Sequence, residues 1–138
     1  MPALATLLQR VSNYRKNRSK NRPRAFDKCI KAIDGRHIYV GSEHVVLNYL
    51  LQSAGAILSK AWMREFHTLC EAEGLTSGED YAQLLWVHDE VQCAVKSEHA
   101  ETLGQLCVKA IENVGEQYKL NCPITGEYKV GDSWKDTH

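Results

Sequence analysis

The sequence predicts an α+β fold, in which long helices pack against an antiparallel sheet. The predicted strands come in adjacent pairs joined by short turns, one pair within residues 29–40 and one within 81–95. Adjacent strands of this kind form hairpins, whereas strands that alternate singly with helices form parallel sheets. The chain has 138 residues, the length of one domain. A chain of this size buries roughly two thirds of the surface that its unfolded form exposes.

The N-terminal segment predicts a helix followed by an arm. Apolar side chains recur at helical spacing within residues 2–14, after a proline where the first turn of a helix tolerates it. Those apolar residues are Leu4, Leu7, Leu8 and Val11. Residues 15–25 lack apolar periodicity and contain Pro23, so we expect a loop or arm. We therefore divide the chain into an N-terminal helix with its basic arm, residues 1–25, and a folded portion, residues 26–138.

The formal net charge is zero, but the two ends of the chain differ in sign. Ten Lys and Arg residues and two Asp residues precede position 37, and acidic residues predominate after it. The basic residues of the arm are Arg15, Lys16, Arg18, Lys20, Arg22 and Arg24. A run of this kind either contacts phosphates, serves as a nuclear-localisation signal, or is a solvated arm without a partner. Contact with nucleic acid is one open interpretation.

The middle of the chain predicts a hairpin followed by a long helix. Apolar residues alternate on both sides of Asp34-Gly35 within residues 29–40, and this dipeptide is the strongest short hairpin signal. Ser42 is placed to cap the following helix. That helix is predicted to run over residues 43–73 and to end before Gly74.

The C-terminal half predicts a second hairpin, a second helix and a final strand. Residues 81–87 and 91–95 form two apolar strands on either side of a polar reversal. A helix begins after Ser97. Its apolar face consists of Leu103, Leu106, Cys107, Ala110, Ile111, Val114 and Tyr118. We expect a strand within residues 122–134, with a turn at Gly131-Asp132.

Cysteine usage and hydropathy place the protein in a reducing, cytoplasmic compartment. The five cysteines are an odd number and form no CxxC pair, which argues against a disulfide framework and a zinc ribbon. No charged-then-apolar leader opens the chain, and no apolar stretch approaches the length of a membrane span.

The reversal between the last two strands carries a histidine and two carboxylates, His88, Asp89 and Glu90. Successive strand side chains point to opposite faces, but at a tight reversal they can turn toward the same open end. Carboxylate oxygens suit Mg²⁺, which keeps several waters and takes one or two protein carboxylates. This motif therefore predicts a magnesium site, and a solvated charged turn is the alternative.

A polar stripe follows one face of the predicted long helix. His44, Asn48 and Gln52 are each four residues apart, so they are expected to stack along the helix among apolar neighbours. An imidazole and two amides can donate hydrogen bonds to the minor-groove acceptors, which lie in nearly the same place in every base pair. The stripe is therefore either a sensor of duplex geometry or the solvated side of an amphipathic helix.

Several of these motifs, in this order, resemble the C-terminal portion of the family A DNA polymerases. The matching segments are "IDGRHIYV", "LNYLLQSAGA", "WVHDEVQ" and "GDSWKDTH", and the likeness is greatest to the replicative polymerases of short-tailed phages. The resemblance covers nearly the whole chain. It implies that the sheet belongs to a polymerase palm and that the reversal is the family's metal-binding hairpin.

The resemblance also assigns roles to the residues singled out above. Asp89 would be one of two aspartates that hold the catalytic Mg²⁺ pair, Glu90 an accessory carboxylate, and His88 a neighbour of the primer-terminal backbone. Asn48 and Gln52 match minor-groove contacts to primer–template DNA. His44 stands where many members carry arginine. The final segment, with Trp134 and His138, matches the characteristic ending of these polymerases.

Other parts of such a polymerase have no counterpart in the sequence. No segment resembles the motif with the other catalytic aspartate or the fingers helix that binds the incoming dNTP. We therefore expect one piece of a split phage-type enzyme, inactive alone and completed by an upstream chain, in the cytoplasm of a bacterial host. Two other readings stay open: a non-catalytic DNA-binding remnant or scaffold that uses the basic arm, and a truncated product without function.

Overall fold

The computed structural model describes residues 5–6, 9, 13, 29–42 and 44–137. The chain divides into two compact units, Met1–Ile57 and Leu58–His138. The predicted basic arm and domain boundary at residue 25 lie outside the described residues, as does most of the predicted helix at 2–14. Within the described part, no helix is both long and apolar enough to cross a membrane.

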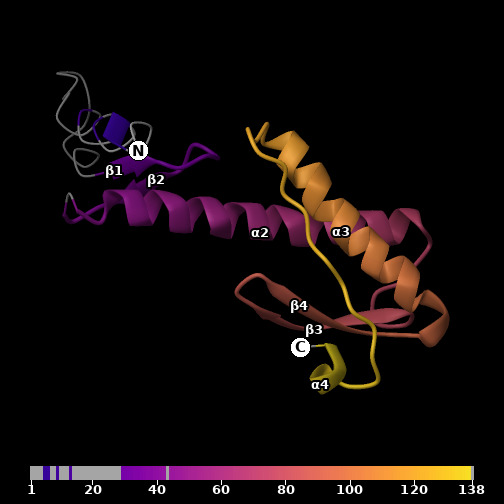
Figure 1. Cartoon of the computed structure of the whole chain (residues 1–138). Helices are drawn as coiled ribbons and strands as arrows, with labels where there is room; N and C mark the ends of the chain where they lie inside the picture. Colours follow the sequence, from indigo (N-terminus) through magenta and orange to yellow (C-terminus); the bar gives the residue numbers. More distant parts are fainter. Residues whose placement is uncertain (1–4, 7–8, 10–12, 14–28, 43, 138) are drawn as a thin grey trace. The chain divides into compact units, whose positions relative to one another are not determined.

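The first unit contains the predicted Asp34-Gly35 hairpin. Strands β1 (Cys29–Lys31) and β2 (His37–Tyr39) pair antiparallel around it (Figure 1). Gly35 has a φ of 90°, a conformation that favours glycine, and the Arg36 amide donates a hydrogen bond to Oδ1 of Asp34 at 3.1 Å. This hairpin is confirmed. The core of the unit consists of Ile30, Val40 and Val46.

The long helix α2 spans Val46–Ala72, so it begins later than predicted. The predicted cap at Ser42 is wrong, because the Ser42 hydroxyl lies 2.9 Å from Nε2 of His44, ahead of the helix. The predicted end is confirmed. Gly74 has a φ of 84°, and the Leu75 amide donates to the Cys70 carbonyl at 2.9 Å. Together they form a glycine C-cap, which ends the helix.

The second unit contains the other predicted hairpin, formed by β3 (Tyr81–Val87) and β4 (Glu90–Val95). Its register pairs are Tyr81↔Val95, Ala82↔Ala94, Gln83↔Cys93, Leu85↔Gln92, Trp86↔Val91 and Val87↔Glu90. Leu84 is the extra residue of a β-bulge, because the register shifts between Gln83 and Leu85. Glu90 was expected in the turn, but it is the first residue of β4. The turn therefore consists of His88 and Asp89 alone.

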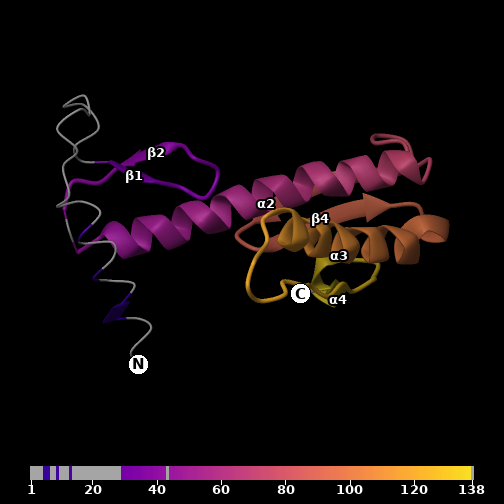
Figure 2. The same cartoon turned by 90° about the horizontal axis from the view of Figure 1, so that it is seen from above.

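Two helices cover one face of this hairpin. After a short 3₁₀ turn at Ser97–His99, α3 runs over Ala100–Gln117 and lies against the second half of α2 (Figure 2). The buried residues of this core are Phe66, Cys70, Leu75, Tyr81, Leu103 and Ala110, with Cys93 and Val95 of β4 packed against them. Because side chains alternate along a strand, Glu90 and Gln92 point to the opposite face.

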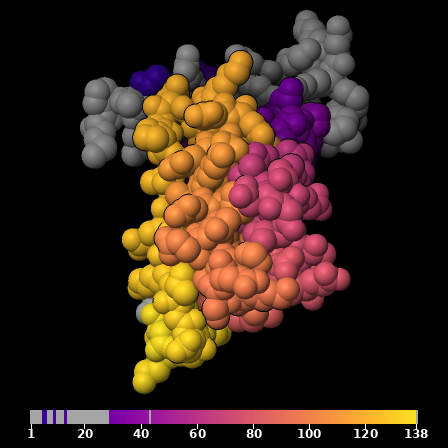
Figure 3. Space-filling view, turned by 90° about the vertical axis from the view of Figure 1, so that its right-hand side faces the viewer, coloured from indigo at the N-terminus to yellow at the C-terminus, as the bar shows by residue number. Residues whose placement is uncertain are grey.

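The C-terminal tail differs from the predicted strand. Residues 121–133 form no strand; they run along α3 and lead to a last helical turn, α4 (Trp134–Thr137), on the far face of the hairpin (Figures 1 and 3). A Cβ atom added to Gly104 of α3 would lie 2.2 Å from the Tyr128 ring, and one on Gly115 would lie 2.8 Å from Ile124. The tail pairs with a helix because these two glycines leave space for its apolar side chains.

Hydrogen bonds fasten the tail to the same helix. Thr125 donates to Glu112 at 2.7 Å, and the Tyr128 hydroxyl donates to the Glu101 carboxylate, which raises the pKa of Tyr128. The tail is thus an extended strap bound along α3, and it carries α4 to the hairpin.

Candidate metal-binding hairpin and nucleic-acid contacts

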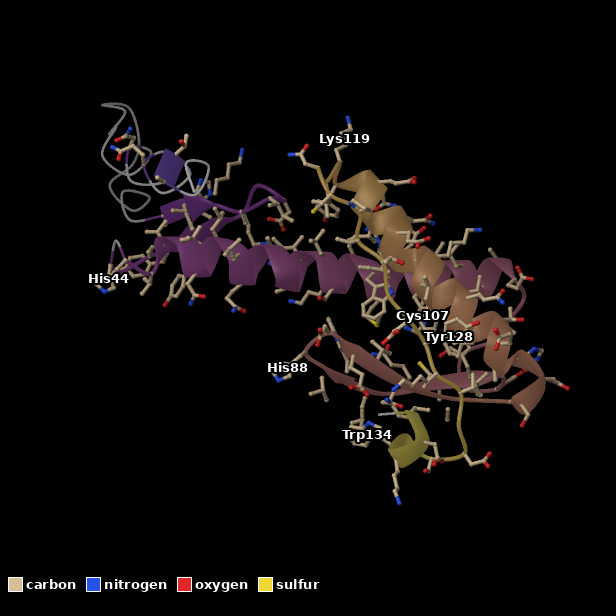
Figure 4. The ribbon with its side chains drawn as sticks, in the orientation of Figure 1. His44, His88, Cys107, Lys119, Tyr128 and Trp134 are labelled. Carbon is tan, nitrogen blue, oxygen red and sulfur yellow. The ribbon has the colours of Figure 1, made fainter. Side chains whose placement is uncertain are left out.

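The turn between β3 and β4 holds His88 in an unusual backbone conformation. Its φ is 56°, and the His88 carbonyl accepts a hydrogen bond from the Trp86 indole at 3.1 Å. A two-residue turn with positive φ at its first position is the type that usually carries glycine there. A histidine in this region costs about 1–2 kcal/mol. Figure 4 shows the His88 ring projecting outward from the tip of the hairpin.

The two carboxylates of the motif have different surroundings. Asp89 is exposed at the second turn position, whereas Glu90 is half-buried at the start of β4. Oε1 of Glu90 accepts hydrogen bonds from Nε2 of Gln92 at 2.5 Å and from Nε1 of Trp134 at 3.3 Å. The chain therefore presents one solvent-facing carboxylate next to one that is held by two donors.

This pair of carboxylates fits a magnesium ion only in part. Hard carboxylate oxygens are the right donors for Mg²⁺, and one or two suffice when substrate phosphates and water supply the remaining ligands. Within the described residues, no three His, Cys, Asp or Glu side chains form a group that could hold a metal ion. Asp89 and Glu90 can therefore supply part of a metal site, and the rest must come from elsewhere.

The predicted polar stripe is only partly helical. Asn48 and Gln52 lie one turn apart on α2 and are both exposed, as a surface that binds DNA requires. His44 lies in the turn before α2, where its ring contacts the Ser42 hydroxyl (Figure 4). The expected stack of three is therefore wrong for His44 and holds for the other two.

The predicted site residues are divided between the two compact units. His88, Asp89 and Glu90 belong to the second unit, whereas His44, Asn48 and Gln52 belong to the first. The basic residues of the arm and His138 lie outside the described residues. They are Arg15, Lys16, Arg18, Lys20, Arg22 and Arg24.

Residues 4–136 match the family model for DNA polymerase family A. The chain belongs to this family. It is 39% identical over 114 residues to the DNA-directed DNA polymerase of Enterobacteria phage T3 and 37% identical over 114 residues to that of Escherichia phage T7. Each match covers 80% of this chain but 16% of the phage polymerase, so the chain spans about a sixth of the length of these relatives.

Two further relatives extend this likeness. The DNA-directed DNA polymerase of Escherichia phage Phieco32 is 25% identical over 99% of this chain and 21% of its own length. The POL domain of Pol1 from M. smegmatis, solved in complex with DNA primer-template and dNTP, superimposes with a TM-score of 0.59 at 23% identity. That match covers 78% of this chain and 19% of the mycobacterial chain, and it shows the shared fold.

Sequence reasoning missed the contacts made by the tail at the hairpin. Trp134 was noted only as part of the family's ending, yet it bonds to Glu90, and Thr137 donates to Oε1 of Gln92 at 3.3 Å. The one available signal was the spacing of Glu90 and Gln92, which places both on one face of a strand. Nothing in the sequence indicates which segment meets that face.

Proposed function

We propose that this chain is the C-terminal palm portion of a template-directed DNA polymerase. In the reaction, the 3′-oxygen of a primer bonds to the α-phosphorus of a dNTP as the bond to the pyrophosphate leaving group breaks. Family membership and the similarity to phage DNA-directed DNA polymerases support this activity. The observation that carries the proposal is the hairpin, whose tight turn fixes Asp89 beside the hydrogen-bonded Glu90.

Asp89 and Glu90 would hold Mg²⁺ at this hairpin. When bound, Mg²⁺ neutralises charge on phosphate oxygens and activates the attacking oxygen. The rigid two-residue turn contributes positioning, because a metal ligand must stay within a fraction of an ångström of its working place. His88 projects from the same turn and is available to the phosphate backbone at the primer terminus.

Two other groups of residues would bind the primer–template. The exposed amides of Asn48 and Gln52 can donate to minor-groove acceptors, which are common to all base pairs. The six basic residues at positions 15–24 would contact phosphates and make DNA binding sensitive to salt. His44, on the turn before α2, would extend this contact surface.

The chain works as part of a larger polymerase assembly. A two-metal centre needs carboxylates from more than one segment, and no three His, Cys, Asp or Glu side chains among the described residues form such a group. A separate upstream chain of a split phage-type enzyme would provide the second aspartate and the dNTP-binding fingers. The phage relatives support a working place in the cytoplasm of a bacterial host.

The proposal is tested by primer extension with Mg²⁺ and dNTPs. The chain is assayed alone and together with a polypeptide that supplies the rest of the palm and the fingers. We expect activity only in the combination. Asp89→Asn should lower that activity by roughly a hundredfold or more, as removal of a group that stabilises reaction charge does.

Glu73→Gln is the matched control, because it also removes one exposed carboxylate, in the turn after α2 and outside the hairpin, and should leave activity unchanged. Salt-sensitive DNA binding without any extension in the combination would contradict the polymerase and favour the non-catalytic remnant.

A further inference from the structure

A chain of hydrogen bonds connects the last helical turn to the metal-binding hairpin. Thr137 donates to Oε1 of Gln92 at 3.3 Å, Gln92 donates through Nε2 to Oε1 of Glu90 at 2.5 Å, and Trp134 donates to the same oxygen at 3.3 Å. Two residues of α4 therefore contact two residues of β4. The spacings match, because residues three apart on a helix and two apart on a strand are separated by similar distances.

Each link of this chain fixes the next one. The Glu90 carboxylate, which only accepts, orients the Gln92 amide with its nitrogen inward. The amide oxygen then faces the Thr137 hydroxyl, whose single proton also lies near the Trp134 carbonyl at 3.1 Å. Both donors to Glu90 then act on a single carboxylate oxygen, which restricts the rotation of a side chain with three flexible torsions. Groups that orient a metal-binding side chain in this way affect metal affinity nearly as much as the ligands do.

The turn that carries these donors is itself held in place. Ser133 donates to Oδ2 of Asp136 at 2.7 Å, which closes α4. Upstream, the Tyr128 ring fills the space above Gly104, and Thr125 bonds to Glu112, so the tail cannot slide along α3. The orientation of Glu90 thus depends on a strap that contains none of the predicted metal ligands.

Simple burial does not account for Trp134. This residue is 49% exposed, so it is not part of the core, and its indole N–H donates to the Glu90 carboxylate. A tryptophan that served only to fill a core would be buried and would not need this donor in this place.

We propose that Trp134 and Thr137 are positioning residues that hold Glu90 in the orientation needed to bind the catalytic metal. This inference rests on the proposed function, since it concerns the metal site of the polymerase. It gives the C-terminal strap a direct part in metal binding.

The test uses two variants that each remove one donor and keep the shape of the side chain. Trp134→Phe keeps an aromatic ring without the N–H, and Thr137→Val keeps the branched shape without the hydroxyl. Thr68→Val is the matched control, because it removes an exposed hydroxyl of α2 that donates to the Arg64 carbonyl and belongs to neither the strap nor the hairpin. All are compared in the complete polymerase assembly by Mg²⁺ titration of primer extension and by Mn²⁺ binding measured with electron paramagnetic resonance.

We expect the half-saturating Mg²⁺ concentration and the Mn²⁺ dissociation constant to rise at least about threefold in both variants, with extension restored at high Mg²⁺. This change is smaller than the tenfold to hundredfold loss of metal affinity that usually follows removal of a group that orients a metal ligand. The reason is that a hydrogen bond of 3.3 Å is long. In the 138-residue chain, the NMR signal of the Trp134 indole proton should shift on Glu90→Gln substitution. This signal does not depend on activity.

The outcomes separate the inference from the function on which it rests. An active assembly whose Mg²⁺ and Mn²⁺ midpoints are the same in all variants would overturn the positioning role and leave the polymerase intact. Lowered thermal stability with unchanged metal binding would also overturn it, because that pattern belongs to packing alone. An inactive wild-type assembly would overturn the proposed function and the inference with it.

Discussion

His88 adopts a conformation that its side chain disfavours, and this cost points to a use for the imidazole. Only two non-glycine residues in the described part of the chain have positive φ, His88 at 56° and Lys119 at 51°. Residues held in this way persist where the surrounding structure or a function requires them. Lys119 closes the end of α3, whereas His88 lies beside the two carboxylates.

We expect His88→Gly to stabilise the chain by about 1 kcal/mol, because glycine adopts this conformation without a clash. The same substitution should lower primer extension by the complete assembly, since the imidazole is lost. Urea unfolding and an extension assay measure the two effects. Lys119→Gly is the control: it should stabilise similarly and leave extension unchanged, and an equal loss of activity there would contradict a role for His88.

At this scale the sequence predicted residue types better than positions. His88 and Asp89 are in the turn as expected, because polar residues between two apolar runs indicate a reversal. Glu90 was misplaced by one position, because the bulge at Leu84 depends on the partner strand and leaves no local pattern. The start of α2 was misplaced because Ser42 bonds to His44 instead of to the helix.

Among the elements, α3 and the tail depend on each other through small residues. Two glycines inside helices have opposite surroundings: a Cβ on Gly104 would collide with the Tyr128 ring at 2.2 Å, whereas one on Gly55 would meet nothing within 4 Å. Helix propensity favours alanine at both positions. Only packing distinguishes them.

We therefore expect Gly55→Ala to raise the stability of the chain by about 0.5–1 kcal/mol and Gly104→Ala to lower it by about 1–3 kcal/mol. Thermal unfolding of the two variants measures the difference. Gly104→Ala should also speed hydrogen exchange in the tail, because the strap must lift to admit the methyl group. Equal stabilisation by both substitutions would mean that the tail does not lie on α3.

The sequence predicted the elements that have a local signal, but not the one whose structure depends on packing. Both hairpins and both long helices are confirmed, because each has a local signal in a turn dipeptide, a helix-ending glycine or an apolar period. The final strand is wrong because alternation in an extended segment does not say whether its partner is a strand or a helix. In this chain, Gly104 and Gly115 decide for the helix.

Four of the five described cysteines, all in the second unit, fall into a protected group and an exposed one; the fifth, Cys29 of β1, is half-buried. Burial raises the pKa of Cys70 to about 11, of Cys93 to about 11 and of Cys107 to about 12. Cys122, by contrast, is exposed on the tail. Since the thiolate is the reactive form, burial and a raised pKa both slow modification of the first three.

We expect a thiol reagent at pH 8 to modify Cys122 well before Cys70, Cys93 or Cys107, as followed by mass spectrometry. The free energy of unfolding should also fall as the pH rises from about 9 to about 11. Above pH 9 the unfolded thiols release protons that the folded ones retain, so the unfolded state is favoured. A Cys122→Ser control should keep this alkaline loss; a flat profile between these pH values would contradict the burial of the three thiols.

Apolar surface is also unevenly distributed over the molecule. Four consecutive residues of β3 are exposed, from Leu84 at 62% to Val87 at 46%, and Leu51 of α2 is 60% exposed. Contiguous exposure of this kind marks surfaces that pack against another chain or segment. It agrees with the proposal that other parts of a polymerase complete this one.

The bulge at Leu84 determines how many residues form the turn of the hairpin. If the strands continued to pair from Gln83 and Cys93 with no bulge, Trp86 would lie opposite Glu90. The loop would then contain three residues, Val87–Asp89. Because Leu84 is unpaired, β3 is shifted by one residue against β4, and the loop contains only His88 and Asp89. A change of pairing far from the tip therefore reshapes the tip: if Leu84 were paired instead of bulged, three residues would form the turn that carries Asp89, whereas deletion of Leu84 would remove the bulge and keep the two-residue turn.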